Sequence, residues 1–249
     1  MKILTTFCVL VACCFHLLSA REVIVDNQHP ACSDAQSGSH DNPFKTIQAA
    51  VDKAEPGDII VVKPGLYREA VCLKRSGTPE MPIVLKSEIP HQAIISGADE
   101  ITNWQHADGN IWHAPLPTKS RYNEHGNGEW LFMDGFPMIQ CQDESKLLPG
   151  MFFFDWEKHV VVMELYAGMT PTSAAFELSV RDGLIRPVGW ITSQKYDHTQ
   201  TINDIEIEGF KLIHNGDWFR GFGAIRVSGS RWKVRNNHIA FAIRDGMDA

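Results

Sequence analysis

The sequence lacks the short motifs that mark the commonest enzyme classes. It contains no Gly-x-Ser-x-Gly elbow, no glycine-rich phosphate loop ending in Lys-Ser/Thr, no Gly-x-Gly-x-x-Gly fingerprint and no His-Glu-x-x-His pair. Asp-x-Asp runs and Asn-x-Ser/Thr glycosylation acceptors are also missing. These absences argue against serine hydrolases of the elbow type, nucleotide-binding enzymes, zinc metalloproteases and calcium-binding repeats.

Basic residues and cysteines are also few. Residues 21–249 carry 22 Lys and Arg against 30 Asp and Glu, a formal charge of −8, because Lys2 is the only charged residue before Arg21. This balance argues against a nucleic-acid partner or an anionic membrane surface. The same region keeps Cys32, Cys72 and Cys141, an odd number at no metal-like spacing. No zinc site is implied, and we expect small half-buried cysteines with at most one disulfide.

Long apolar runs are missing beyond the first 20 residues, so we predict no transmembrane segment. Met1 and Lys2 precede an apolar run, Ile3–Leu18, that is short for a membrane span. We therefore predict a signal peptide over residues 1–20 and a secreted or cell-surface protein, periplasmic or extracellular. An alternative is lipoprotein anchoring through Cys13, because Leu10–Cys13 is similar to a bacterial lipobox.

A recurring pattern is the most informative feature that is present. Ile205–Asn215 and Trp232–Ala240 share an alternating strand, a turn residue and a second apolar pair, about one solenoid coil apart. Such a rung cannot bury its inner face alone and must stack on copies of itself. We predict an all-β parallel β-helix. The sequence stops at Ala249 inside a rung, so we expect a fold truncated at the C-terminus, with an uncapped coil at which the chain self-associates or frays.

Residues 21–100 predict a capped start of the solenoid. A strand is expected over Val23–Val25, and strands recur after residue 58. Between them we predict a helix with Asn42 as N-cap and Pro43 in its first position, ended by Glu55–Asp58. Its covering face repeats at helical spacing through Phe44, Ile47, Val51 and Ala54.

Residues 101–180 break the solenoid rhythm and predict an inserted antiparallel β-rich lobe that rests against this helix. Leu131–Pro137 has the Asp-Gly turn of a hairpin, and Phe152–Asp155 and Val160–Met163 add two strands. Residues 181–249 would then form further, incomplete coils. Four tryptophans fall in the lobe, and we favour a role in its core over a sugar-stacking platform: Trp104, Trp112, Trp130 and Trp156.

Several stretches resemble a known family. Asp34–Glu69, with Asn42–Ala50, Pro56–Asp58 and Pro64–Glu69, resembles the N-terminal cap and first coil of secreted right-handed parallel β-helix proteins of the pectate lyase-like superfamily. The resemblance continues through Ser76–Thr78 and Pro82–Leu85. Phe153–Asp155 with Val160–Val162 is similar to the inserted lobe of bacterial β-helix proteins grouped with glycoside hydrolases, and Gly223–Ile225 to Gly246–Asp248 is similar to their following coils.

The resemblance implies a carbohydrate-active protein whose partner is a polysaccharide, but it does not fix the reaction. Hydrolases place two carboxylates across the scissile bond, whereas lyases use Lys or Arg, usually with Ca²⁺. The candidate catalytic pair is Asp245 and Asp248, with Asp217 and Arg244 as substrate-binding candidates. The alternative for these aspartates is ordinary turn chemistry beside glycine. No metal or cofactor is assigned, and Ca²⁺ is a candidate only for a lyase, where Asp217, Asp245 and Asp248 could bind it.

Other polar residues of the coils have structural explanations. A lyase could use Arg226, Lys233, Arg235 and Arg244. We favour the alternative, in which these residues, with Glu206 and Glu208, are the solvated outward half of the strand alternation. His214 and His238 are expected to pack in turns, and Asn236-Asn237 resembles the start of an internal asparagine ladder. The sequence therefore favours a polysaccharide hydrolase over a lyase. The alternatives are a fragment that is inactive by itself and a non-catalytic glycan-binding or adhesive surface solenoid.

Overall fold

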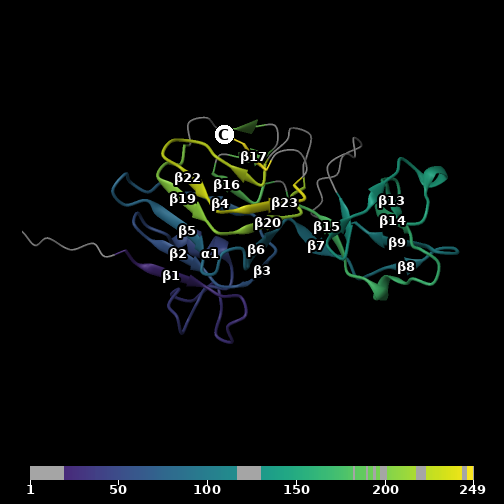
Figure 1. The fold of residues 1–249 in the computed structure, drawn as a ribbon, viewed down its shortest axis with the longest axis horizontal. Helices are drawn as coiled ribbons and strands as arrows, with labels where there is room; N and C mark the ends of the chain where they lie inside the picture. The colour runs from purple at the N-terminus through teal and green to yellow at the C-terminus, as the bar shows by residue number, and fades with distance from the viewer. Residues whose placement is uncertain are drawn as a thin grey trace, which may run out of the picture.

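The computed structural model describes residues 20–116, 130–181, 183–188, 190–192, 195–196, 201–216, 223–242 and 246–248. Two bodies lie side by side along the long axis of the molecule (Figure 1). One is a coiled stack of parallel strands, and the other is a lobe of mostly antiparallel strands. Among the described residues, no helix has the length and hydropathy needed to cross a membrane.

Three parallel sheets form the walls of the stack. Sheet A has the order β1-β2-β5-β19-β22, sheet B the order β3-β6-β20-β23, and sheet C the order β4-β16-β21-β24. Every coil gives one strand to each sheet, which confirms the predicted parallel β-helix. Strand β1 (Glu22–Val25) starts sheet A. Coil 1 consists of β2 (Ile59–Val62), β3 (Gly65–Tyr67) and β4 (Val71–Leu73), and coil 2 consists of β5 (Ile83–Ser87), β6 (Ala93–Ser96) and β16 (Ile185–Pro187). Coil 3 consists of β19 (Ile205–Glu208), β20 (Lys211–Ile213) and β21 (Ile225–Arg226), and coil 4 consists of β22 (Lys233–Arg235), β23 (His238–Ala240) and β24 (Met247–Asp248).

Coils 3 and 4 repeat with a period of 27 residues in sheets A and B. Glu206 pairs with Lys233, and Lys211 pairs with His238, in parallel register. The left-handed backbone positions repeat with the same period. They are Asp204 and Arg231 (φ 58° and 58°), Gly209 and Asn236 (78° and 53°), and His214 and Phe241 (58° and 52°). The recurrence predicted from the sequence is therefore confirmed in both the register and the backbone conformation.

Alternation along strands such as β4 and β5 separates the core from the surface. In sheet A, Ile60, Leu85 and Ile207 stack in register and are buried. Their neighbours Lys86 and Glu208 point to the other face, because successive side chains of a strand alternate. The stacked inner rows of the three sheets form one continuous apolar core.

Helix α1 (Ile47–Lys53) covers the first coil, but it begins later than predicted. Its N-cap is Thr46, whose side chain accepts a hydrogen bond from the amide of Ala49. The prediction of Asn42 as N-cap with Pro43 and Phe44 in the first turn is wrong. Phe44 donates to the carbonyl of Ile24 and accepts from the amide of Asp26, so this segment pairs with β1 instead of coiling. The end of the helix at Ala54 agrees with the prediction.

The lobe branches from coil 2 between β6 and β16. Strands β7 and β15 leave and return as an antiparallel pair, with Ala98 opposite Ser179. The Asp134-Gly135 turn, with φ of 50° and 81°, makes the predicted hairpin, and β13 pairs with β14 as a second one. The lobe consists of β7 (Ala98–Glu100), β8 (Gln105–His106), β9 (Ile111–Pro115), β10 (Leu131–Met133), β11 (Phe136–Pro137), β12 (Ile139–Gln140), the 3-10 turn η1 (Glu144–Lys146), β13 (Met151–Asp155), β14 (Val160–Glu164), η2 (Pro171–Ser173) and β15 (Phe176–Ser179).

The lobe has its own core, separate from that of the β-helix. Trp104, Trp112 and Trp156 pack against it, which confirms the core interpretation for three of the four tryptophans. The expectation that the lobe rests against the helix is wrong. Helix α1 packs chiefly on β1, β2 and β4, and in Figure 1 the lobe lies beyond β7 and β15, away from it. The physical reason is the branch point, because the chain leaves coil 2 at the corner between β6 and β16, whereas α1 packs on β1, β2 and β4.

Candidate functional site

The corners of the β-helix differ in how much their length varies. Three of the four corners between sheets A and B have two residues, and the fourth has five. The corners on either side of sheet C vary from a few residues to the whole lobe. Loops carried on a rigid scaffold are where binding and catalytic residues gather, so sheet C is the candidate functional face. The corners between sheets B and C are residues 68–70, 97–184, 214–224 and 241–246. The corners between sheets C and A are residues 74–82, 188–204 and 227–232. Corner 188–204 contains the hairpin of β17 (Trp190–Thr192) and β18 (Lys195–Tyr196).

The outward face of sheet C carries one row of polar residues. Cys72 pairs with Arg186, and Arg226 pairs with Asp248. Ile185 pairs with Ile225, which places Arg186 beside Arg226. The inward neighbours Ile185 and Ile225 are fully buried, so the row faces outward. Adjacent strands are about 4.8 Å apart, so the row presents one side chain per coil at that spacing.

The first member of the row is not an activated nucleophile. Burial raises the pKa of the Cys72 thiol above its ordinary value, although Arg186 and Lys74 act in the opposite direction. A thiol with a raised pKa remains protonated at neutral pH and reacts slowly. Cys32, Cys72 and Cys141 are all unpaired, which agrees with the prediction of half-buried free cysteines. The chemistry that the described part of the row offers is therefore that of two guanidinium groups.

The predicted site residues lie on or next to this face as far as they are described. Asp248 belongs to β24 and lies in register with Arg226, while its side chain is outside the described part. Asp217, Arg244 and Asp245 lie outside the described residues. The proximity of Asp245 and Asp248 therefore stays a prediction.

A buried cluster of Glu177, Arg68 and His214, called the Glu177 cluster, joins the lobe to the β-helix. Sequence reasoning did not find it. Glu177 of β15 forms an ion pair with Arg68, which follows β3, and Nη1 of Arg68 lies 2.6 Å from a carboxylate oxygen of Glu177. Nδ1 of His214 lies 3.4 Å from the other oxygen of Glu177, without the geometry of an aligned hydrogen bond. His214 and then Arg68 hold the pKa of Glu177 below its ordinary value. A carboxylate kept charged in this way suits an ionic anchor and not a general acid.

His214 occupies the corner after β20 and is only 2% exposed. Its ring stacks on Phe132 of the lobe, with centroids 3.9 Å apart, and its Nε2 lies 3.2 Å from the carbonyl of Gly135. The prediction that His214 packs in a turn is confirmed, and the packing is between the β-helix and the lobe. No local signal could have shown this, because Arg68, Glu177 and His214 are distant in the sequence.

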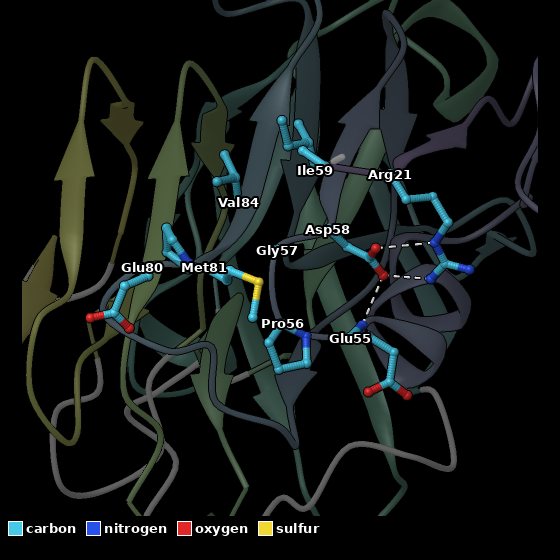
Figure 2. Close-up of a pocket in the computed structure, with 11 residues that line it drawn as sticks. Arg21, Glu55, Pro56, Gly57, Asp58, Ile59, Glu80, Met81 and Val84 are labelled. Carbon is cyan, nitrogen blue, oxygen red and sulfur yellow. Dashed lines mark hydrogen bonds and ion pairs between the residues drawn. The ribbon is translucent and has the colours of Figure 1, made fainter. Parts of the chain in front are cut away.

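A groove of about 450 Å³ lies on the outward face of sheet A near α1 (Figure 2). Its apolar lining comes from Pro56, Ile59, Met81, Pro82 and Val84, together with Gly57 and Ala20. Figure 2 shows the carboxylate of Asp58 held by the guanidinium of Arg21 and by the amide of Glu55. The carboxylates of Glu55 and Glu80 point away from each other at the rim. The groove therefore offers an apolar surface and no converging pair of acids.

Further along sheet A, charged residues form ion pairs between coils. Lys233 lies 2.6 Å from Glu206, and Arg235 lies 3.2 Å from Glu206 and 3.1 Å from Glu208. These residues belong to the outward half of the strand alternation, as predicted, but Glu206 is only 8% exposed and not solvated, because it is held between two cationic side chains. Among the described residues, no group of three or more His, Cys, Asp or Glu side chains is placed to hold a metal ion.

Sequence comparisons match parts of the chain. The Chondroitinase B family profile matches residues 42–104. An uncharacterized protein, YwoF of Bacillus subtilis, is 34% identical over 68 residues, 27% of this chain and 14% of its own length. Pectate lyase PEL9 of Emericella nidulans is 33% identical over 93 residues, 34% of this chain and 23% of its own length. The chain thus spans less than a quarter of these curated relatives.

Structural comparisons cover more of the chain. The structure of XylC with xylose has a TM-score of 0.74 at 21% identity, over 89% of this chain and 40% of the XylC chain. A glycoside hydrolase has a TM-score of 0.58 at 12% identity, over 79% of this chain and 51% of its own. At these identities the likeness establishes the fold, which is the parallel β-helix also used by carbohydrate-active proteins.

Proposed function

We propose that this chain, which has the pectate lyase-like parallel β-helix fold, binds a polysaccharide along the outward face of sheet C and serves the hydrolysis of its glycosidic bonds. The observation that carries the proposal is the row of Arg186, Arg226 and Asp248, flanked by the corners whose lengths vary. The alternative from a different class is a non-catalytic glycan-binding or adhesive solenoid. The hydrolase and the non-catalytic solenoid would both bind the glycan on the same face, and only the hydrolase would cleave it.

The row suits a linear glycan. A guanidinium presents several N–H donors in a planar fork, which can bond hydroxyl or carboxylate oxygens of a sugar. Arg186 and Arg226 lie on neighbouring strands, so their Cα atoms are separated by about 4.8 Å along the stack. A chain lying along the stack would meet one such donor group per coil, and Asp248 would follow in the next coil.

Hydrolysis is favoured over elimination because of where the similarities fall. The Chondroitinase B match covers residues 42–104, and the distinctive residues there build the fold. Glu69 accepts hydrogen bonds of 2.9 Å from the amides of Ile47 and Gln48 at the start of α1. The Tyr67 hydroxyl donates to the carbonyl of Lys63. Likeness to lyases in this stretch is thus carried by structural residues, whereas a structure described as a glycoside hydrolase is similar over 79% of the chain.

The proposed acid pair is Asp245 and Asp248, which for a hydrolase would be separated by roughly 5 to 9.5 Å. Asp217 and Arg244 are proposed to contact the substrate. We also propose that residues 1–20 direct export, with lipidation at Cys13 as the alternative anchor. Ca²⁺ enters only if the reaction is elimination.

The first experiment measures binding of the full chain to a panel of neutral and acidic polysaccharides by affinity electrophoresis. We expect Arg186→Ala and Arg226→Ala each to raise the dissociation constant about tenfold, as the loss of a buried arginine contact does at many interfaces. Arg235→Ala is the matched control, because Arg235 is an outward arginine of a parallel strand on sheet A. Equal binding by all three variants and the wild type would contradict the placement of the glycan on sheet C.

The second experiment separates the reaction classes on the polysaccharide that binds. New reducing ends without unsaturated products support hydrolysis, and unsaturated products support elimination. Binding without either product supports the non-catalytic alternative. Asp245→Asn and Asp248→Asn should each abolish hydrolysis, and Asp245→Asn should leave binding within about threefold of the wild type. Unchanged hydrolysis in both variants would remove them as the acid pair.

A further inference from the structure

We propose that Phe136 and Phe241 together form a stacking platform for one sugar ring of the polysaccharide, at the junction between the lobe and the β-helix. This inference rests on the proposed polysaccharide binding and names a further binding site for it. The platform is distinct from the arginine row, because its contribution is apolar and its members come from the lobe and from coil 4.

The two rings converge from distant parts of the chain. Phe136 follows the Asp134-Gly135 turn of the lobe hairpin and is 68% exposed, the most exposed of the large apolar side chains described. Phe241 follows β23 and is 37% exposed. Their centroids are 6.1 Å apart, with an angle of 73° between the ring planes. The pair therefore forms an angled apolar surface that faces solvent.

The platform has a rigid base. Phe132 is fully buried beneath it, with its ring centroid 6.3 Å from that of Phe241 and 3.9 Å from that of His214. The contact of His214 Nε2 with the carbonyl of Gly135 joins the hairpin turn to coil 3. Because this contact holds the turn in place, a ligand that stacks on Phe136 loses little binding free energy to ordering of the turn. Preorganised aromatic anchors of this kind dominate many binding sites.

The position of the platform indicates a sugar as its occupant. Phe241 opens the corner 241–246, which leads into β24, where Asp248 lies beside Arg226. The platform is thus continuous along the chain with the row proposed to bind the glycan. A pyranose ring has an apolar C–H face and hydroxyl groups at its edge, so it can cover an aromatic ring while its hydroxyls remain solvated or bonded. Of the four tryptophans that the sequence offered for this role, Trp104, Trp112 and Trp156 pack on the lobe core instead, and the ring centroid of Trp130 lies 6.1 Å from that of the buried Phe132.

The test compares four substitutions by calorimetric titration of the full chain with the polysaccharide that the wild type binds. We expect Phe136→Ala and Phe241→Ala each to raise the dissociation constant about tenfold. Phe136→Leu keeps an apolar side chain without an aromatic face and should behave like Phe136→Ala, whereas Phe136→Trp should retain binding. Leu148→Ala is the control, because Leu148 is 58% exposed on the same lobe and outside the aromatic cluster. It should bind like the wild type.

The outcomes separate this inference from the proposed function. If Phe136→Ala and Phe241→Ala bind within about twofold of the wild type while Arg226→Ala binds weakly, the platform is refuted and the sheet C face stands. If Phe136→Leu binds like the wild type, stacking is refuted in favour of general apolar contact. If the wild type binds no polysaccharide of the panel, both proposals are refuted. Thermal denaturation of each variant confirms that it is folded, and Phe136→Leu provides a readout even if Phe241→Ala unfolds.

Discussion

Glu177 joins three parts of the chain through one carboxylate. It belongs to the lobe, while Arg68 comes from coil 1 and His214 from coil 3. Its side chain is largely buried, with an exposed fraction of 13%. A buried carboxylate that lost both partners would remain desolvated without compensation, so the three residues depend on one another. The cluster therefore couples the position of the lobe to the protonation of a single residue.

This coupling predicts a pH dependence. The pKa of Glu177 in the folded protein lies below the ordinary value of 4.5, so the folded state binds fewer protons than the unfolded state near and below that value. Stability from Glu177 is therefore present above the unfolded pKa and lost as the pH falls through the folded pKa. We expect urea denaturation to show this loss in the wild type and not in Glu177→Gln. Glu88→Gln is the control, because Glu88 forms an exposed ion pair with Lys63, and its pH dependence should match that of the wild type.

Single residues also show the limits of prediction from sequence. Turn chemistry predicted Asp134-Gly135 correctly, because the positive φ at both positions is a local requirement. Gly97 carried no such signal. A Cβ atom there would lie 2.4 Å from the carbonyl oxygen of His214 in coil 3, so the need for glycine arises only from the stacking of coils. Glu69 is similar, because its role as the acceptor for the amides of Ile47 and Gln48 depends on tertiary contact.

At the scale of the element, side chains in the A–B corners tie successive coils together. Asn237 accepts a hydrogen bond from the amide of Phe210 through Oδ1 and donates from Nδ2 to the carbonyl of Ile207. Both partners belong to the preceding coil, which agrees with the prediction of an asparagine ladder beginning here. One asparagine thus satisfies backbone groups on both sides of a turn.

Replacing Asn237 should weaken this stacking. Asn237→Ala leaves a buried amide and a carbonyl without partners, so we expect the free energy of unfolding to fall by about 1 to 2 kcal/mol. Asn236→Gly is the matched control. Asn236 has a φ of 53° and corresponds to Gly209 in coil 3, with a φ of 78°, so glycine fits the same conformation. Chemical denaturation of the two variants measures the difference, and equal stability would show that the bonds of Asn237 contribute nothing.

Elements were predictable where local signals agreed with long-range pairing. The alternation in Ile205–Glu208 placed β19 correctly, because Ile205 and Ile207 face the core, although Glu206 on the other face is also buried. The start of α1 was missed because Asn42 and Thr46 are both good N-caps. The choice was decided by hydrogen bonds between Phe44 and the strand β1, which are not encoded near Asn42. The sequence could not predict that Arg186 lies beside Arg226 in the row, because the lobe separates β16 from the preceding strands of its coil.

At the scale of the whole molecule, the β-helix and the lobe are two cores connected at one branch. Their buried apolar clusters share no residue. They are joined by the β7–β15 pair, by the Glu177 cluster and by the ion pair of Arg181 Nη2 with Asp99 Oδ1 at 2.8 Å. Val180 donates to the carbonyl of Gly97, so the outgoing and returning chains meet at the wall of the β-helix. The lobe is therefore an insertion that leaves the coil beneath it closed.

This architecture predicts that the lobe can be removed. Asp99 and Leu178 face each other in the antiparallel pair, so an Asn-Gly turn can join them in place of residues 100–177. The core of the β-helix would keep all its members, and we expect far-ultraviolet circular dichroism to retain a strand spectrum. Arg68 and His214 would lose Glu177, and His214 would also lose Phe132, so the melting temperature should fall.

The same variant links the fold to the proposed binding. It lacks Phe136, so its affinity for the polysaccharide should be no higher than that of Phe136→Ala, while the remaining affinity should still depend on Arg226. A variant that loses its strand spectrum would show that the β-helix needs the lobe to fold, and the two cores would then form one cooperative unit. A folded variant with wild-type affinity would instead mean that the lobe takes no part in binding, because the only platform residue left would be Phe241 without its partner ring.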